Sequence, residues 1–364
     1  MTRTVRKLLG VVLASALPLS ACGQGSQAPP SESRATHSTP SADTSASQGG
    51  SSASPPSTGD PTRARFRVGG SAWVTVSVAT VWRSPDSPRD VDAPALTRPV
   101  RLEGWLAGMT VDERRGLNGR ADTQVLLGDE VRVVGLTRRW AEVVVPTQPT
   151  PSDARGYPGW VPLRQLTATR PTAARQVATV VTRTAWLRTD HDEGRRLLRV
   201  SYGTRLPVMG LGAGYATVAT PSGRRGRVDR TSVVVHRPDE PAVPPEAESL
   251  VAGVGSFVGL PYLWAGASGF GVDCSGLTWL VHRVHGVTIP RDAAAQAEQG
   301  APAPRLLPGD LMFYAVSGSV HHVSMYVGEG RMVHAPGTGE SVELATTDTR
   351  PYADEFLVAR RYLP

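Results

Sequence analysis

The chain has 364 residues, of which 40% are hydrophobic and 20% charged, so it is long enough for two or three packed domains. The formal net charge is +7, and nearly all of the positive charge is arginine, since Lys7 is the only lysine. A basic surface favours anionic partners. No nucleic-acid-binding motif accompanies the charge, so we expect attraction to an anionic cell envelope and no nucleic-acid partner.

Residues 1–22 are typical of a bacterial lipoprotein signal. A basic start precedes the apolar stretch 8–19, which is too short to cross a bilayer. The tetrapeptide Leu-Ser-Ala-Cys ending at Cys22 resembles the lipobox, which implies lipidation of Cys22. An ordinary cleaved signal and a plain membrane anchor are the alternatives. We expect a protein outside the cytoplasm, lipid-anchored in the cell membrane and facing the cell wall.

Residues 23–65 are mostly Ser, Pro, Thr, Ala, Gly and Gln. Such a segment cannot bury enough apolar surface to offset the entropy lost on ordering, which predicts a disordered tether. A flexible chain of roughly forty residues reaches about 35 Å. The tether therefore allows the folded part to stand off a membrane.

Residues 66–168 and 177–236 read as two copies of one small β-domain. The segment 128–136 is echoed by 203–211, and Trp140-Ala141-Glu142-Val143 by Tyr215-Ala216-Thr217-Val218. Short strands that repeat in this way predict two small barrels better than one large domain. The pair resembles tandem bacterial SH3-like domains.

The first copy carries an insertion at 84–123 that the second copy lacks. Residues 102–109 and 111–117 favour helices, with Thr110 as a cap of the second. A long insertion in a compact barrel is often functional. After the second copy, the Pro-rich segment 237–246 predicts a stiff linker.

The stretch around Cys274 carries the first chemical signal. Leu277, Leu280, Val281 and Val284 recur at helical spacing after it, and Gly286 stands where a helix would end. Cys274 is therefore expected to begin a helix, where unpaired backbone N–H groups favour the thiolate. The alternative is a buried cysteine that acts as a small hydrophobe.

Two histidine-bearing segments follow further along the chain. Residues 319–328 alternate apolar and polar residues and predict a strand with His322 on one face. A Gly-Glu-Gly turn leads into a second strand that carries His334. A cysteine, a histidine and an orienting polar group are the parts of an activated-thiol enzyme.

Region 247–364 resembles the NlpC/P60 cysteine peptidases, which cut cell-wall peptides. Six motifs occur in the order of that family: Pro261-Tyr262-Leu263-Trp264-Ala265-Gly266, Asp273-Cys274-Ser275-Gly276, Pro290-Arg291, Pro308-Gly309-Asp310-Leu311, His322-Val323 and His334-Ala335. The resemblance implies two small all-β SH3-like barrels followed by an α+β, papain-like NlpC/P60 domain. It also implies that the insertion lies against the peptidase and narrows its cleft.

The resemblance implies a nucleophile at Cys274, a base at His322 and an orienting role for His334. His321 is expected on the surface, and His334 could instead only cap a strand. Histidine and cysteine ligands for zinc are disfavoured, because no close ligand pair such as His-x-x-x-His occurs. We expect neither a metal nor a cofactor.

Three further residues have implied roles in binding substrate. Tyr262 would stabilise the oxyanion, and Asp273 with Ser275 would bind the free amine of a terminal L-alanine. Tyr262 could instead pack beside Trp264, and Asp273 could cap the helix of Cys274. Arg291 and Gln296 are expected to support the cleft.

The predicted reaction is hydrolysis of a peptide bond in the peptidoglycan stem peptide, through a thioester on Cys274. The resemblance implies the bond between γ-D-glutamate and a diamino acid, with small muropeptides favoured over intact wall. The alternatives are an inactive wall-binding or regulatory lipoprotein and an amidase or acyltransferase on the same scaffold. The sequence does not predict the diamino acid, the ligand of the barrels or the oligomeric state.

Overall fold

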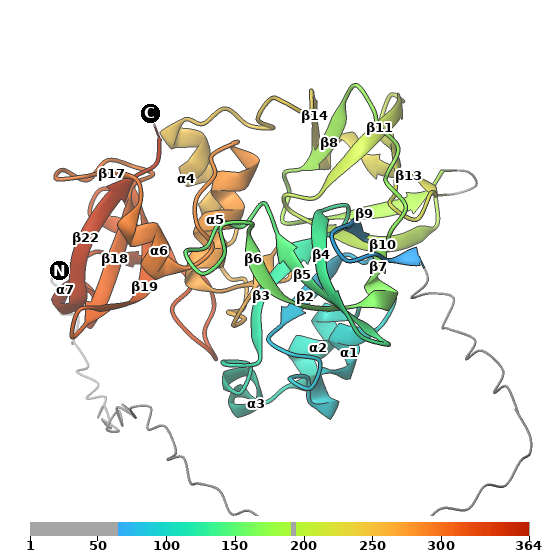
Figure 1. Ribbon diagram of the computed structural model, residues 1–364. Coiled ribbons are helices and arrows are strands. Elements are labelled where there is room, and N and C mark those ends of the chain that lie inside the picture. The colour runs from blue at the N-terminus through green and yellow to red at the C-terminus, as the bar shows by residue number, and fades with distance from the viewer. Residues whose placement is uncertain (1–64, 191–193, 364) are drawn as a thin grey trace, which may run out of the picture. The chain divides into compact units, whose positions relative to one another are not determined.

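The computed structural model describes residues 65–190 and 194–363 (Figure 1). The expected signal at 1–22, with Cys22, and the tether up to residue 64 lie outside the described residues. The described part of the chain contains two seven-stranded sheets, a six-stranded sheet, a two-stranded sheet and seven α-helices. None of its helices is long and apolar enough to cross a membrane.

The first sheet is the first predicted barrel. Its strands pair in the order β3-β2-β6-β5-β4-β1-β7. They are β1 (Ser71–Val74), β2 (Val78–Trp82), β3 (Ala121–Leu126), β4 (Glu130–Leu136), β5 (Trp140–Val145), β6 (Tyr157–Pro162) and β7 (Leu166–Thr167), with the 3₁₀ turn η3 (Leu163–Gln165) before the last. Valines that alternate along these strands form the core, which includes Val74, Val131, Val143 and Val161.

The second sheet repeats this topology strand for strand. Its order is β10-β9-β13-β12-β11-β8-β14. The strands are β8 (Val177–Val180), β9 (Thr184–Thr189), β10 (Arg196–Ser201), β11 (Arg205–Leu211), β12 (Tyr215–Ala219), β13 (Arg225–Asp229) and β14 (Val233–His236), with η4 (Arg230–Ser232) before the last. The bulge between Val133 and Gly135 in β4 recurs between Val208 and Gly210 in β11. A repeated bulge and a repeated strand order explain the echo in the sequence.

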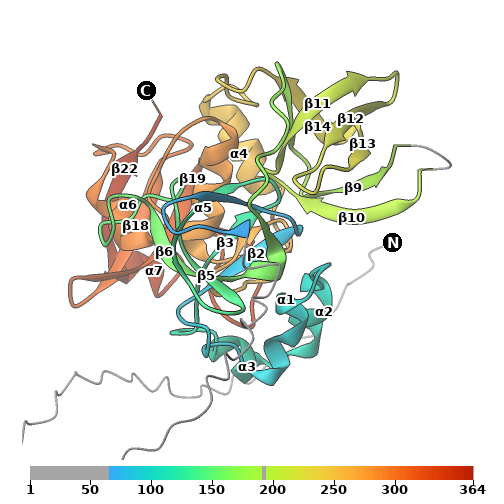
Figure 2. The ribbon, with the colours of Figure 1, turned by 45° about the vertical axis from the view of Figure 1, so that its right-hand side comes forward.

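The insertion between β2 and β3 is helical, as expected. It contains η2 (Asp90–Asp92), α1 (Ala93–Leu96), α2 (Leu102–Gly108) and α3 (Val111–Arg115), which lie together in Figures 1 and 2. Thr110 caps α3 in a capping box with Glu113. Helix α1 was not expected from the sequence. Pro94 lies in its first turn, and the buried Asp92 before it accepts a hydrogen bond from Trp105 Nε1 at 3.0 Å.

The C-terminal domain is α+β, which confirms the predicted fold class. Its sheet has the order β17-β22-β18-β19-β20-β21. The strands are β17 (Ala301–Pro302), β18 (Leu311–Val316), β19 (Ser319–Gly328), β20 (Arg331–His334), β21 (Glu343–Thr346) and β22 (Phe356–Arg361), beside the small hairpin of β15 (Ala267–Ser268) and β16 (Gly271–Val272). The helices are α4 (Ala247–Gly255), α5 (Cys274–Val284), α6 (Ala293–Glu298) and α7 (Tyr352–Glu355).

The first barrel is bonded directly to the C-terminal domain. Trp264 Nε1 donates to the carbonyl of Ala121 at 2.9 Å. Gln124, which is fully buried on β3, accepts from the backbone of Ala267 and the hydroxyl of Ser268 at 3.1 and 2.8 Å. Most buried polar groups in proteins are paired in this way, as the side-chain oxygen of Gln124 is here. These contacts fix β3 of the barrel against the hairpin that precedes Cys274.

The insertion shares a hydrophobic core with the C-terminal domain. Trp105 and Leu106 of α2 belong to the same buried cluster as Tyr262, Leu263 and Cys274. Burial of apolar area contributes about 25 cal/mol per Å², so two large side chains shared across a junction stabilise it substantially. The insertion therefore lies against the domain that carries the candidate site.

Candidate active site

Cys274 is the first residue of α5, as the sequence predicted. Asp273 caps the helix, and its side chain accepts from the backbone N–H of Gly276 at 2.7 Å. Cys274 is the only free cysteine among the described residues, and it is buried. Its sulfur also lies beside the backbone N–H of Val323, the residue after His322. The helix start thus brings the thiol to β19.

Glycine is required one turn into this helix. A Cβ at Gly276 would collide with the carbonyl oxygen of Gly266 and lie 2.9 Å from Asp273 Oδ1. The loop before the hairpin can approach α5 this closely only because position 276 has no side chain. This steric reason accounts for the glycine in the Asp-Cys-Ser-Gly motif.

Asp273 forms a buried ion pair with Arg291. Arg291 Nη1 and Nη2 donate to its two carboxylate oxygens at 3.0 and 2.7 Å, and Arg291 is 1% exposed. Arg291 Nη1 also donates to Ser275 Oγ at 3.0 Å, and its Nε donates to Thr123 Oγ1 of the first barrel at 2.9 Å. A bidentate pair of this kind fixes geometry as well as charge. Arg291 therefore locks the first turn of the cysteine helix to β3.

Gln296 supports the same turn from α6. Its amide nitrogen donates to the carbonyls of Ser275 and Pro290 at 3.1 and 2.8 Å, and its oxygen accepts from Thr278 at 2.9 Å. Gln296 is fully buried. Arg291 and Gln296 thus brace the segment around Cys274, in the supporting positions expected for them.

The environment of the thiol differs from the expectation of a thiolate. Burial, followed by the neighbouring charge of Asp273, raises the pKa of Cys274 to about 12. The backbone N–H groups of Val323 and Ser275 act in the opposite direction but do not outweigh burial. The expectation was wrong because it counted the helix terminus and not the enclosure of the sulfur. The raised pKa favours the protonated thiol in the free protein.

His322 and His334 lie side by side on neighbouring strands, β19 and β20. Their Nε2 and Nδ1 atoms are 2.9 Å apart, and both residues are buried. Burial, then the adjacent His334 and His321, lowers the pKa of His322 well below 6.5. His322 is therefore neutral at pH 7, which is the state that can accept a proton.

Glu343 lies beyond this pair and was not found from the sequence. It is directly opposite His334 in the β20–β21 register, and its Oε1 lies 3.3 Å from His334 Nε2. Burial lowers the pKa of His334, and Glu343 acts in the opposite direction. Glu343 stands in a stretch of no known motif, so only the strand register, which the sequence does not specify, could have located it.

Two tyrosines complete the surroundings of the thiol. Burial, followed by the charges of Cys274 and Asp273, raises the pKa of Tyr262, which keeps its hydroxyl protonated. Tyr352 of α7 lies 4.9 Å from the ring of His322 and 4.7 Å from that of His334, measured between centroids. Burial also raises the pKa of Tyr352, with Cys274 among the contributing charges. Tyr352, eighteen residues beyond His334, was not expected at the site from the sequence.

The other histidines of the domain lie apart from this group. His321 is exposed and 3.1 Å from Glu355, as expected for a surface residue. His282 and His285 are buried on α5, where each ring bonds the carbonyl four residues earlier at 2.8 Å. They are packing residues.

Carboxylates gather where the first barrel meets the C-terminal domain. Tyr157 Oη donates to Asp292 Oδ1 at 3.3 Å. Burial, followed by the charge of Asp292, raises the pKa of Tyr157, with Asp122 also contributing. Asp292 directly follows Arg291, the partner of Asp273. This group was missed because its members come from separate domains.

The buried thiol lies against β19, the strand that carries the neutral His322, and His322 bonds His334. Glu343 lies 3.3 Å from His334. A thiol, an imidazole and orienting polar groups are the parts of a thiol hydrolase. No group of three or more potential metal ligands occurs in the described residues. The arrangement therefore defines the chain as a thiol-dependent enzyme of papain-like organisation.

Comparisons with known proteins identify the family. The model of the NlpC/P60 family matches residues 259–361, and that of the YKFC SH3b2 domain matches residues 180–236. A crystal structure of an NlpC/P60 family protein from Bacillus cereus superposes with a TM-score of 0.77 and 40% identity, over 81% of this chain and 100% of that one.

Two curated relatives are similar over most of their length. A protein named gamma-D-glutamyl-L-lysine dipeptidyl-peptidase from Bacillus cereus is 42% identical over 80% of this chain and 91% of its own. The protein of the same name from Bacillus subtilis is 38% identical over 79% and 97%. The chain belongs to the NlpC/P60 family, and it is a peptidase of the cell-wall type. The predicted combination of SH3-like domains with this peptidase is confirmed.

Proposed function

We propose that this peptidase cleaves stem peptides between γ-D-glutamate and L-lysine or another diamino acid, releasing an N-terminal dipeptide. The observation that carries this is the similarity, over nine-tenths or more of their length, to two proteins named for that activity. Such an activity requires a stem peptide with a free amino terminus, because a dipeptidyl-peptidase releases dipeptides from that end.

Glu343 sets the protonation pattern of the catalytic chain. Its carboxylate lies 3.3 Å from His334 Nε2, and a negative charge there favours a proton on Nε2, so neutral His334 presents an unprotonated Nδ1. His322 Nε2–H then donates to that Nδ1, which leaves His322 Nδ1 free to act as a base. His334 thus orients His322, and both imidazoles start neutral.

Catalysis proceeds through two half-reactions. In the first, the sulfur of Cys274 attacks the carbonyl carbon and its proton passes to His322, which delivers it to the departing amine. In the second, His322 takes a proton from water, whose oxygen attacks the thioester and releases Cys274 as the thiol. The free thiol is protonated, so the proton is transferred as the attack occurs.

The oxyanion of each intermediate is stabilised by Tyr262 and by backbone N–H groups at the start of α5. A tyrosine whose pKa is raised retains its proton and can donate to the developing charge. Tyr262 is 6% exposed, so little water competes for this bond.

The substrate's terminal amine is bound by carboxylates at the junction with the first barrel. Asp273 alone is poorly suited, because Arg291 already compensates its charge. Asp292 adds negative charge near Tyr157, and the bond from Tyr157 orients it. Asp122 also lies near Tyr157, although the exposed Arg83 pairs with it at 2.8 Å. A compact ammonium group is complementary to this cluster.

The protein acts outside the cytoplasm, anchored through a lipid on Cys22. This placement rests on the lipobox-like sequence before Cys22, since that residue lies outside the described part of the chain. Globomycin-sensitive processing and labelling with a palmitate analogue, both lost in Cys22→Ala, test it directly.

Product analysis tests the activity. The full chain and Cys274→Ala are incubated with L-Ala-γ-D-Glu-L-Lys and with the same peptide N-acetylated. Release of L-Ala-γ-D-Glu from the free peptide alone supports the proposal. Cleavage of both peptides at equal rates contradicts a role for the terminal amine.

A further inference from the structure

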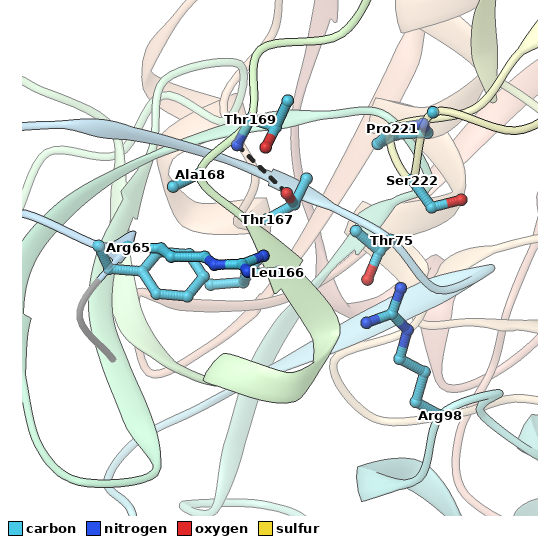
Figure 3. A pocket seen from close by; sticks show the side chains of 11 residues that line it. Arg65, Thr75, Arg98, Leu166, Thr167, Ala168, Thr169, Pro221 and Ser222 are labelled. Carbon is cyan, nitrogen blue, oxygen red and sulfur yellow. Dashed lines mark hydrogen bonds between the residues drawn. The ribbon is translucent and has the colours of Figure 1, made fainter. Parts of the chain in front are cut away.

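A pocket of about 490 Å³ lies where the two barrels meet, apart from the thiol site. Figure 3 shows its lining, which comes from the start of the described chain, the β1–β2 connection, the insertion, β7 with its continuation, and the turn between β12 and β13. Nothing in the proposed peptidase mechanism uses this pocket. Its residues are therefore free to serve a separate function.

The charge lining the pocket is entirely positive. Arg65 and Arg98 contribute guanidinium groups, and no aspartate or glutamate is among the lining residues. Among the described residues, neither arginine has a carboxylate within ion-pair distance. Arg98 makes one long contact, 3.5 Å, to the carbonyl of Arg164. Two uncompensated guanidinium groups at one pocket favour an anionic ligand.

Hydroxyl groups between the arginines offer further donors. Thr75 is 8% exposed, and its Oγ1 has no hydrogen-bond partner in the described part of the chain. A buried hydroxyl without a partner has a hydrogen to donate to a ligand that enters the pocket. Thr167 Oγ1 accepts from the backbone N–H of Thr169 at 3.2 Å, which leaves its own hydrogen available. In the view of Figure 3, Thr75 appears between Thr167 and Arg98.

The arrangement of donors suits a phosphate better than a carboxylate. Arginines from two separate segments and hydroxyls from two others approach from different sides, whereas a carboxylate accepts mainly in one plane. The cavity is also much larger than a phosphate ion, so it has room for the group that a phosphate carries. We propose that this pocket binds the phosphodiester unit of a polyol phosphate polymer and so tethers the peptidase to an anionic wall polymer.

Calorimetric titration of the full chain with poly(glycerol phosphate) at physiological salt tests the proposal. Loss of both guanidinium groups in Arg65→Gln with Arg98→Gln should raise the Kd at least about tenfold. Thr75→Val removes the unpartnered hydroxyl at nearly constant volume and should raise the Kd several-fold, without lowering the melting temperature.

The matched control removes the same charge elsewhere on the first barrel. Arg138 and Arg139 are exposed in the β4–β5 turn and do not line the pocket. Arg138→Gln with Arg139→Gln should change the Kd by no more than about twofold, which is the general effect of lost charge. Equal weakening in the two double variants would overturn the proposal. So would a DNA oligonucleotide that displaces the polymer as well as free poly(glycerol phosphate) does. Peptidase activity should be unchanged in all variants, which separates this test from that of the catalytic site.

Vesicles distinguish the two sources of a phosphodiester. Flotation is measured with phosphatidylglycerol vesicles and with phosphatidylcholine vesicles as the neutral control. Polymer binding without vesicle binding assigns the site to a soluble polyol phosphate. Vesicle binding that the Arg65 and Arg98 double variant loses assigns it to lipid headgroups. If the wild-type chain binds neither ligand, the pocket is not a phosphodiester site.

Discussion

His334 Nε2 lies 3.3 Å from Glu343 Oε1, and the two residues face each other across β20 and β21. The other ring nitrogen of His334 lies 2.9 Å from His322 Nε2, so the charge of one carboxylate acts on both rings. Glu343 is half exposed, whereas His334 is buried, so the carboxylate connects the interior of the site to solvent.

Glu343→Gln should therefore lower kcat about three- to tenfold with little change in KM. Without the carboxylate, the tautomer of His334 that orients His322, and the protonated His322 formed during the reaction, are less stable. The substitution should also lower the pKa of His334, because Glu343 favours the protonated ring. Steady-state kinetics over pH 5–9 measure both effects. Glu343→Asp should restore part of kcat if the carboxylate can still reach His334.

Glu355→Gln is the matched control, since Glu355 pairs with the exposed His321 in the same way. It should leave kcat within about twofold, as expected for a surface pair. A loss of kcat equal to that of Glu343→Gln would show that general charge, and not the proximity of Glu343 to His334, is responsible.

Alkylation of Cys274 should be strongly pH-dependent. Because burial raises its pKa to about 12, the thiolate fraction should rise about tenfold per pH unit between pH 7 and 9. Iodoacetamide labelling followed by mass spectrometry gives this rate. A rate that is constant over this range would instead mean a preformed thiolate–imidazolium pair and would contradict the protonated thiol described here.

The sequence was sufficient to predict the elements that carry the site. The structure contains the predicted helix after Cys274, the strand around His322 and the strand that ends at His334. Each of these segments has strong local periodicity in the sequence. The repeated topology of the two barrels also follows from a repeated pattern of strands and turns.

What the sequence could not provide was contact between distant segments. Glu343 depends on strand register, Tyr352 on the placement of a short helix, and Tyr157 on docking of a barrel against another domain. The expectation of a thiolate at Cys274 was wrong for a similar reason, since enclosure of the sulfur by β19 and Tyr262 is a tertiary effect.

Folding should become less stable in acid because of His282. Burial lowers the pKa of His282 from 6.5 to about 4. Between pH 4 and 6.5, the folded state therefore binds fewer protons than the unfolded chain. Stability is then full above pH 6.5 and decreases as the pH falls, by about 3 kcal/mol at pH 4 from this group alone. Urea unfolding at several pH values measures the slope.

His282→Asn separates this effect from packing. An asparagine amide can still donate to the carbonyl of Thr278, as His282 Nδ1 does, but it does not titrate. The variant should be less stable at pH 7 because of the smaller side chain, and its stability should decrease less between pH 6.5 and 4. An unchanged slope would assign the acid sensitivity to other groups.

The buried pair of Arg291 and Asp273 should be essential to folding. Arg291→Met leaves a buried carboxylate uncompensated and should cost about 3–5 kcal/mol in the free energy of unfolding. Adding Asp273→Asn should recover part of this loss, since no buried charge then remains. Denaturant titration of the single and double variants tests the coupling. Additive losses would show that the two residues act independently.

Cleavage by Cys274 at the γ-D-glutamyl bond is tested most directly by digestion of two substrates, free L-Ala-γ-D-Glu-L-Lys and intact sacculi, by the full chain and by Cys274→Ala. Mass spectrometry of the products should show L-Ala-γ-D-Glu released from the tripeptide by the wild-type chain only, with sacculi left uncut. Release that persists in Cys274→Ala, or cleavage of sacculi in place of the tripeptide, would contradict the account.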